Sequence, residues 1–160
     1  MQGYYTRCQM RLEEIGAPTE NWDCSHVIDQ ERDGFVCELC GCEKVRFIHV
    51  MEHRDYPDQL SVGCICAGTM EGNLLAAKER DKKMKNRAKR KENFQNHIWK
   101  KERNGIHTRT YQGKKLAICA NKGVYECWGS QMPIMKSNVN FKETLVKIFD
   151  IVDPEADVMK

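Results

Sequence analysis

Two short cysteine pairs are the residues of this chain best suited to chemistry. Two residues separate Cys37 from Cys40. One residue separates Cys64 from Cys66, and a glycine flanks each pair. Two thiolates at such spacing can reach one ion when the backbone turns between them, and glycine tolerates a tight turn. Because zinc takes four tetrahedral ligands and accepts Cys and His, the pairs predict one structural Zn²⁺ site.

The sequence leaves the identity of the fourth ligand open. Cys37 and Cys40 form a zinc knuckle, and Cys66 is expected in the first turn of a helix, where the helix dipole favours a thiolate. Cys64 is the simplest fourth ligand, although Cys-x-Cys gives a tighter bite than Cys-x-x-Cys. The other residues that can complete the site are Cys24, His49 and His53.

The elements predicted around these cysteines follow the order of a treble clef. Residues 45–51 are rich in β-branched and aromatic side chains and predict a strand, Tyr56-Pro57-Asp58 predicts a turn, and residues 60–62 predict a return strand. From residue 67 the chain is rich in helix formers and lacks proline, which predicts one long helix, or two with a break near Asn93. Knuckle, hairpin and helix together indicate a treble-clef-like zinc module.

The same stretch also resembles a family of bacterial and phage proteins. It contains C-x-x-C, then V-R-F-x-H-x-M-x-H, a Tyr-Pro pair, and G-C-x-C-A-G-x-M-E, all within residues 37–73. These shared motifs are specific over that range and extend only weakly beyond it. The resemblance implies a zinc-binding fold and a bacterial or phage origin, and it implies no particular activity.

The hairpin histidines raise the alternative of a metal-dependent treble-clef nuclease. In that hypothesis His53 acts as general base with Asp55 nearby, and Asn73 is the only candidate to complete the set from the following helix. A supporting role beside the zinc ligands is the simpler interpretation of His49 and His53. We therefore predict no catalytic residue and a protein that is not an enzyme.

Charge is strongly segregated along the chain. Residues 1–77 hold 6 Lys and Arg against 13 Asp and Glu, whereas residues 78–103 hold 12 against 4. With few acidic partners in its own segment, the basic stretch should repel itself unless phosphate neutralises it. Cation release from phosphates drives such binding, so the leading hypothesis is a zinc-stabilised nucleic-acid-binding protein.

The nucleic-acid-binding residues predicted on this helix are Lys82, Lys83, Arg87, Arg90 and Lys91. The main alternative is a protein–protein interaction module, such as a phage-encoded inhibitor of a host enzyme, with the acidic front or the basic helix as its docking surface. Phe94 and Trp99 are expected to be the helix's contacts with the core.

In the last part of the chain, apolar and polar residues alternate with a period of two. Residues 107–113, 114–123 and 124–130 predict three short strands, Pro133 predicts a loop, and residues 141–152 predict an amphipathic helix capped by Asn140. Three aromatic residues of these strands can form a binding face or pack against that helix, and packing is the preferred interpretation: Tyr111, Tyr125 and Trp128. The predicted fold class is α+β, with a zinc module at 1–77, a basic helix at 78–103 and a small antiparallel sheet with a closing helix at 104–160.

Composition sets the remaining expectations. The chain has 160 residues and no apolar run near the roughly 18 residues that span a bilayer, so no membrane partner is predicted. The first residues are charged and lack the apolar core of a signal peptide. With nine cysteines, an odd number, a disulfide framework is not expected, and the predicted location is the cytoplasm.

Overall fold

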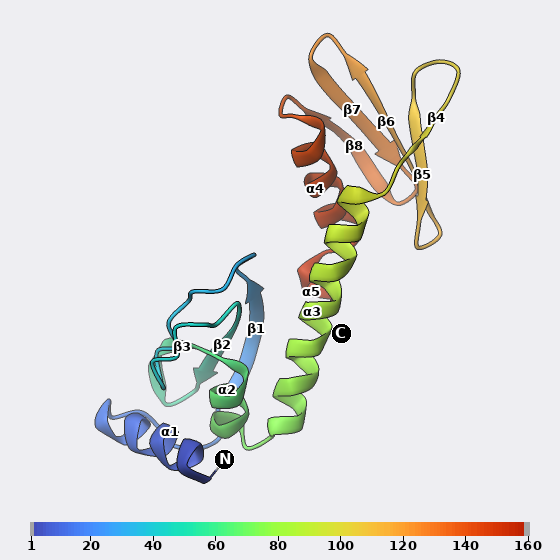
Figure 1. Ribbon diagram of the computed structural model, residues 1–160. Helices are drawn as coiled ribbons and strands as arrows, with labels where there is room; N and C mark the ends of the chain where they lie inside the picture. The colour runs from blue at the N-terminus through green and yellow to red at the C-terminus, as the bar shows by residue number, and fades with distance from the viewer. Residues whose placement is uncertain (1, 159–160) are drawn as a thin grey trace. The chain divides into compact units, whose positions relative to one another are not determined.

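The structure is a computed structural model that describes residues 2–158 (Figure 1). It confirms the α+β class, because helices accompany two small antiparallel sheets. The helices are α1 (Gln2–Glu14), α2 (Cys64–Glu71), α3 (Leu74–Asn96), α4 (Phe141–Val152) and α5 (Glu155–Val158). The strands are β1 (Asp23–Asp29), β2 (Phe47–His53), β3 (Tyr56–Val62), β4 (Lys100–Lys101), β5 (His107–Tyr111), β6 (Lys114–Asn121), β7 (Val124–Gly129) and β8 (Met132–Ser137). No helix in this part of the chain is long and apolar enough to cross a membrane.

The chain forms two compact units, each with its own sheet. The first unit extends to Ala88 and includes Val158, and the second is Lys89–Asp157. The boundary lies inside α3, so the basic segment contributes residues to both units. The division predicted from the sequence follows charge, whereas these units follow packing.

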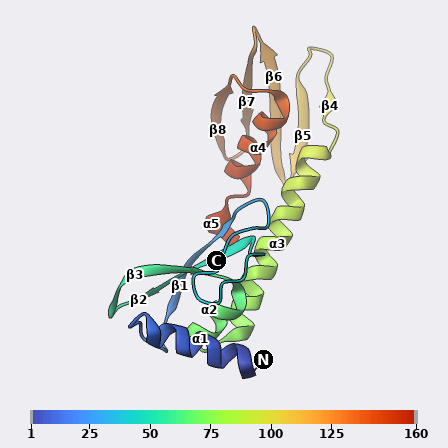
Figure 2. The same ribbon diagram turned by 60° about the vertical axis from the view of Figure 1, so that its left-hand side comes forward.

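The first unit is organised around a sheet of order β1-β2-β3 (Figures 1 and 2). The central strand β2 is buried over five consecutive residues, Phe47 to Met51, because both of its faces are covered. Val50 belongs to the larger core together with Leu12 of α1 and Met70 of α2. Phe47 packs instead with Met84 of α3.

The hairpin that joins β2 and β3 turns earlier than predicted. Arg54 and Asp55 form the turn, and Pro57, which was expected in it, lies in β3. β3 is an edge strand, so the missing N–H of a proline there need not break a ladder hydrogen bond. The predicted strands are confirmed, with β3 longer than expected at its N-terminal end.

The helical stretch is broken at Gly72, not near Asn93. Gly72 adopts a left-handed conformation (φ 72°) and its N–H bonds the carbonyl groups of the last turn of α2. The Asn73 side chain then accepts a hydrogen bond from the N–H of Ala76 (3.1 Å) and caps the start of α3. A glycine and a capping asparagine in succession therefore end one helix and begin the next.

The second unit is a five-stranded antiparallel sheet in sequential order β4 to β8, with α4 against one face (Figures 1 and 2). The three predicted strands correspond to β5, β6 and β7. The predicted loop at Pro133 is wrong, since Pro133 lies in the edge strand β8, where proline is tolerated. The predicted cap of α4 is confirmed: Asn140 Oδ1 accepts from the Glu143 N–H at 2.9 Å.

The core of this unit is aromatic. The prediction for Phe94 and Trp99 is confirmed, because their rings meet edge to face at 5.9 Å and both are buried. Tyr111 and Tyr125 also pack in the core on the α4 side of the sheet. Trp128 does not join them, so the prediction that it packs against the last helix is wrong.

A close approach between α2 and α3 gives a test of this packing. A Cβ on Gly68 would lie 2.7 Å from Leu74 Cα, at the first residue of α3. Gly68→Ala is therefore expected to lower the free energy of unfolding by about 2 kcal/mol, although alanine is the better helix former. Chemical denaturation measures the change. In the matched control Gly3→Ala the new Cβ meets nothing within 4 Å, so stability should stay equal or rise, and equal losses in both variants would contradict the packing.

Candidate metal centre

Three of the predicted cysteines come together in the first unit. The sulfur atoms of Cys37, Cys40 and Cys66 all lie within 4.8 Å of one another, and this group can hold a metal ion. Cys37 and Cys66 are buried, and Cys40 is partly exposed. The thiols are free and form no disulfide.

Backbone hydrogen bonds close the knuckle that presents the first two thiols. Gly41 adopts a left-handed conformation (φ 73°), and its N–H bonds the Cys37 carbonyl at 2.9 Å. The amides of Cys40 and Gly63 both point at Cys37 Sγ, each at 3.5 Å. Gly63 is the N-cap of α2, so these contacts tie the knuckle to the helix that carries Cys66.

Helix geometry separates Cys64 from Cys66. Cys64 is the first residue of α2, and two residues correspond to about 200° around a helix. Cys66 therefore faces the knuckle, while Cys64 faces the charged groups of α3. Burial, and next the charge of Asp81, raise the pKa of Cys64.

A fourth thiol comes from α1 and was missed in the sequence. Cys8 is fully buried, and its Sγ lies 3.4 Å from Cys66 Sγ. That distance is too long for a disulfide and short enough for two ligands of one ion. Cys8 stands alone in the sequence, with no second cysteine or glycine beside it. Nothing local marks it as a ligand, so only the packing of α1 identifies it.

Tyr4 completes the surroundings of the sulfur atoms. It lies one helical turn before Cys8, on the same face of α1. Its hydroxyl donates a hydrogen bond to Cys40 Sγ at 2.8 Å and lies 3.5 Å from Cys66 Sγ. Burial and these hydrogen bonds raise the pKa of Tyr4, so the phenol stays protonated and can donate to a thiolate.

The other predicted fourth ligands lie elsewhere. The electrostatic neighbours of Cys24 are Arg80 and Glu71. His53 packs its ring on Trp22, with the centroids 5.3 Å apart. Neither residue, nor Cys64, belongs to the cysteine group.

His49 is fully buried and also lies outside the group. Its Nε2 lies 3.6 Å from Asp81 Oδ1, which is beyond hydrogen-bond distance, and neither ring nitrogen has a hydrogen-bond partner among the described residues. His49 thus faces α3 from the central strand and takes no part in the sulfur cluster.

The residues of the nuclease hypothesis have structural roles. His53 Nδ1 accepts a hydrogen bond from the backbone N–H of Asp55 at 3.0 Å, and the Asp55 carboxylate lies 3.6 Å from Arg54 Nε. Asn73 caps α3. Within the described chain, the cysteine group is the only cluster of His, Cys, Asp and Glu side chains spaced to hold a metal.

Three of the five predicted nucleic-acid-binding residues are used inside the protein. Arg87 is only 1% exposed. Arg90 makes two hydrogen bonds to the buried Asp153, at 2.7 and 2.9 Å, and Lys91 pairs with Asp150 at 3.3 Å. A neutralised or buried cation offers little charge to phosphate, so these three side chains offer less than the sequence suggested, and their contact with nucleic acid stays a prediction.

The remaining charges of α3 are partly paired as well. Arg80 forms a bidentate pair with Glu71, and Lys85 pairs with Asp81 at 2.8 Å. The expected self-repulsion is therefore relieved by carboxylates that are distant in sequence or one turn away. Exposed lysines with no ion pair among the described residues are Lys78, Lys82, Lys83 and Lys89.

Comparison with known proteins assigns no family or function to the chain. No family model, no curated protein and no solved structure matches the chain. The resemblance of residues 37–73 to bacterial and phage sequences thus stays a prediction.

The place of Cys8 can be tested by substitution. Cys8→Ser is expected to reduce bound metal and to destabilise the protein as strongly as Cys37→Ser, because a structural metal supplies folding free energy of about 10 kcal/mol or more. Elemental analysis of the purified protein and thermal unfolding give the two readouts.

The matched controls are Cys64→Ser and Cys119→Ser, which should keep the wild-type metal content. A Cys8→Ser protein with full metal content, together with loss of metal from Cys64→Ser, would return the fourth position to Cys64.

Proposed function

We propose that this protein is a zinc-stabilised nucleic-acid-binding protein whose first unit is a treble-clef-like zinc module. The observation that carries the zinc assignment is the group of Cys37, Cys40 and Cys66, whose sulfur atoms lie within 4.8 Å of one another, with Cys8 Sγ 3.4 Å from Cys66 Sγ. Four thiolates are one of the usual donor sets of structural zinc sites. The order of knuckle, hairpin and ligand-bearing helix supports the treble-clef comparison.

The donor set argues for zinc over other metals. Sulfur ligands select zinc and iron–sulfur clusters, whereas Mg²⁺ and Ca²⁺ prefer oxygen. Zinc–sulfur bonds of about 2.3 Å place tetrahedral sulfur atoms about 3.8 Å apart. The distance of 3.4 Å between the sulfurs of Cys8 and Cys66 is close to that value, and the sulfurs of Cys37, Cys40 and Cys66 lie within 4.8 Å of one another. Cys8 would have to move toward Cys37 and Cys40 to complete the tetrahedron.

The site is built for stability and not for catalysis. A catalytic zinc keeps one position open for water, whereas here the buried Cys8, 3.4 Å from Cys66, is available as a fourth ligand. Tyr4 covers the partly exposed Cys40 with its hydroxyl. Metal binding would release protons, since the hydrogen bond with Cys66, followed by burial, raises the pKa of Cys37.

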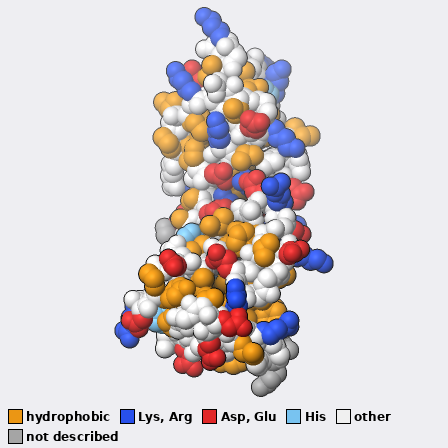
Figure 3. Space-filling view, turned by 90° about the vertical axis from the view of Figure 1, so that its left-hand side faces the viewer, with side chains coloured by type: hydrophobic (Ala, Val, Ile, Leu, Met, Phe, Trp, Pro, Cys, Tyr) orange, Lys and Arg blue, Asp and Glu red, His pale blue; other side chains and the backbone are white. Residues whose placement is uncertain are grey.

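Unpaired lysines on α3 support the nucleic-acid assignment. Lys78 and Lys82 are four residues apart and lie on one exposed face of the helix, with Lys83 beside them. Lysines in such a row attract phosphate without reading base sequence. In contrast, residues 1–77 hold 13 Asp and Glu against 6 Lys and Arg, and phosphate should avoid the acidic groups among them. The lower part of Figure 3 shows Asp and Glu side chains interspersed with Lys and Arg around apolar side chains.

Reduced thiols also suit the proposed cytoplasmic location. Cytosolic reductants keep cysteines free for metal binding. A bacterial or phage origin would follow if the resemblance of residues 37–73 reflects common descent.

Salt dependence provides the test. Lys78→Gln, Lys82→Gln and Lys83→Gln together are expected to weaken binding to all duplex sequences alike. The slope of log affinity against log salt should shrink by about 0.9 for each lost phosphate contact. Fluorescence anisotropy with a labelled duplex measures both effects. Gln preserves helix propensity, so loss of the helix would not explain the result.

The charge-matched control replaces exposed lysines elsewhere: Lys44→Gln, Lys142→Gln and Lys147→Gln. This variant should bind like wild type apart from a small general effect of net charge. If neither DNA nor RNA binds the wild type at low salt, the α3 surface must serve a protein partner, and the inhibitor hypothesis takes precedence.

A further inference from the structure

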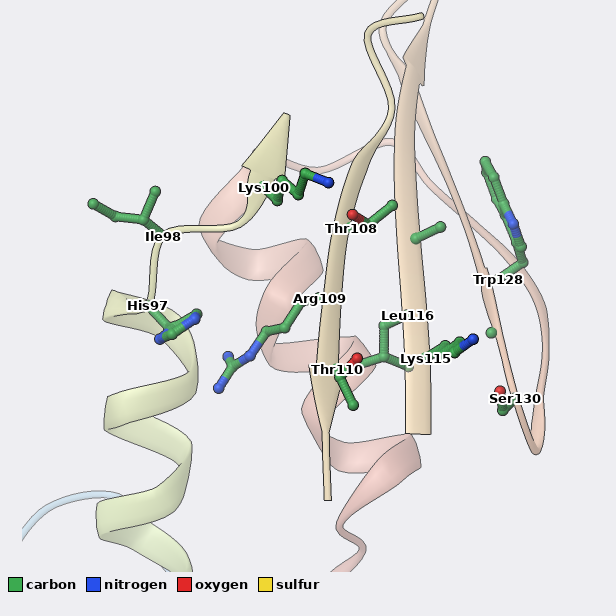
Figure 4. Close-up of a pocket in the computed structure, with 12 residues that line it drawn as sticks. His97, Ile98, Lys100, Thr108, Arg109, Thr110, Lys115, Leu116, Trp128 and Ser130 are labelled. Carbon is green, nitrogen blue, oxygen red and sulfur yellow. The ribbon is translucent and has the colours of Figure 1, made fainter. Parts of the chain in front are cut away.

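The second sheet has an outer face that the proposed α3 contact does not use. Leu116, Ile118 and Cys127 point into the core beside α4. Side chains alternate along a strand, so the residues between them point to the opposite side. Residues of this outer face include Lys100, Thr108, Thr110, Lys115, Ala117 and Trp128. They line a cavity of about 630 Å³ in the second unit (Figure 4).

Trp128 is the distinctive residue of this face. Trp22 and Trp99 are only 1% and 6% exposed, whereas Trp128 is half-buried. Its cross-strand partner is Ala117, whose small side chain leaves room beside the indole. Figure 4 shows the indole on the same side of the sheet as Thr108 and Lys115. Trp128 is partly exposed, and no ring contact involves it within residues 3–158.

The pairing of β7 with β6 sets the direction of this tryptophan, because Trp128 lies opposite Ala117 and so shares its outer face. On the other side, Cys127 pairs with Met135 and Gly129 pairs with Met132, so Trp128 lies opposite two residues of β8, and β8 carries the bulge. Bulges are frequent beside functional sites.

The C-terminal end of β7 is held close to Lys115. The Ser130 N–H bonds the Lys115 carbonyl at 2.9 Å. A Cβ on Gly129 would collide with the same carbonyl, so only glycine permits this approach. Trp128 and Lys115 thus border the same cavity from neighbouring strands.

The charge of the cavity favours an anion. Lys115 has no ion pair in the described part of the chain, and Lys100 pairs only with the partly exposed Glu102 at 3.2 Å. Asp and Glu are absent from the residues that line the cavity. The Thr108 hydroxyl donates to Glu102 Oε1 at 3.1 Å, so the hydroxyl groups left as neutral hydrogen-bond donors are those of Thr110 and Ser130.

We propose that this outer face binds single-stranded nucleic acid, with a base stacked on Trp128 and the adjacent phosphate at Lys115. The inference rests on the proposed function and adds the form of nucleic acid that the second unit takes. An open sheet with an aromatic residue and flanking cations suits a single strand, whose bases are free to stack. A duplex keeps its bases inside and cannot reach the indole.

The test compares a labelled oligo(dT) or oligo(U) with a duplex of equal length on the full zinc-loaded chain. Trp128→Ala is expected to weaken single-strand binding about 5- to 100-fold, because stacking on an aromatic side chain contributes about 1–3 kcal/mol per base. Duplex affinity should stay unchanged. Trp128→Tyr should restore most of the single-strand affinity, since it keeps an aromatic ring.

Two further variants define the site. Lys115→Gln should reduce the single-strand salt slope by about 0.7, the value for one phosphate on a single strand. The control Ile151→Ala truncates an exposed apolar side chain of α4 in the same unit and should leave all affinities unchanged.

The outcomes separate this inference from the proposed function. If the wild type binds no nucleic acid, both are overturned. If the wild type binds single strands and Trp128→Ala binds them equally well, the inference is overturned and the proposed function stands on α3. A mononucleotide that saturates the site as tightly as the oligonucleotide would replace the polymer with a small nucleotide ligand.

Discussion

The first unit depends on one constraint: thiols from separate segments must come together. Cys37 and Cys40 of the knuckle meet Cys66 of α2, and Cys8 of α1 lies beside Cys66 with 3.4 Å between their sulfur atoms. The backbone between these segments forms the first sheet, so the contacts among the sulfur atoms hold α1, the knuckle and α2 together. In the proposed zinc-bound protein the metal takes over part of the stabilisation that a unit of this size would otherwise need from a larger apolar core. The surrounding contacts, from the Gly63 amide to the Tyr4 hydroxyl, then orient the ligands.

The basic helix shows why a count of charges in a sequence is a weak guide to a binding surface. Twelve Lys and Arg residues lie in residues 78–103. Packing has removed several of them from solvent or paired them with carboxylates, as Arg90 with Asp153 and Arg80 with Glu71 show. These partners are far away in the sequence or lie on another helix, which is why the segment looked unbalanced. What remains for phosphate is a smaller and better-defined row of exposed lysines.

The two units carry different kinds of candidate surface. The exposed lysines of α3 supply positive charge alone. The outer face of the second sheet supplies an aromatic plane, a cation and hydroxyl groups around one cavity. Charge alone accounts for salt-dependent and sequence-independent affinity. A stacking platform distinguishes an unpaired strand from a duplex. In the proposed function the first surface therefore provides general affinity and the second selects the form of nucleic acid.

Local patterns in the sequence determined the α+β class, the Cys37–Cys40 knuckle, the strand through His49 and the capped helix after Asn140. Each depends on residues within a few positions of one another, so spacing and propensity suffice. Tertiary structure decided the rest. It brought in Cys8 because α1 packs beside α2, and it excluded Cys64 because the helix begins early enough to turn that thiol away from Cys66. It likewise placed Trp128 on the outer face of the second sheet, through its pairing with Ala117 of β6. The direction in which a side chain points depends on where its helix or strand begins and on what packs against it. Neither can be deduced from the spacing of residues in the sequence.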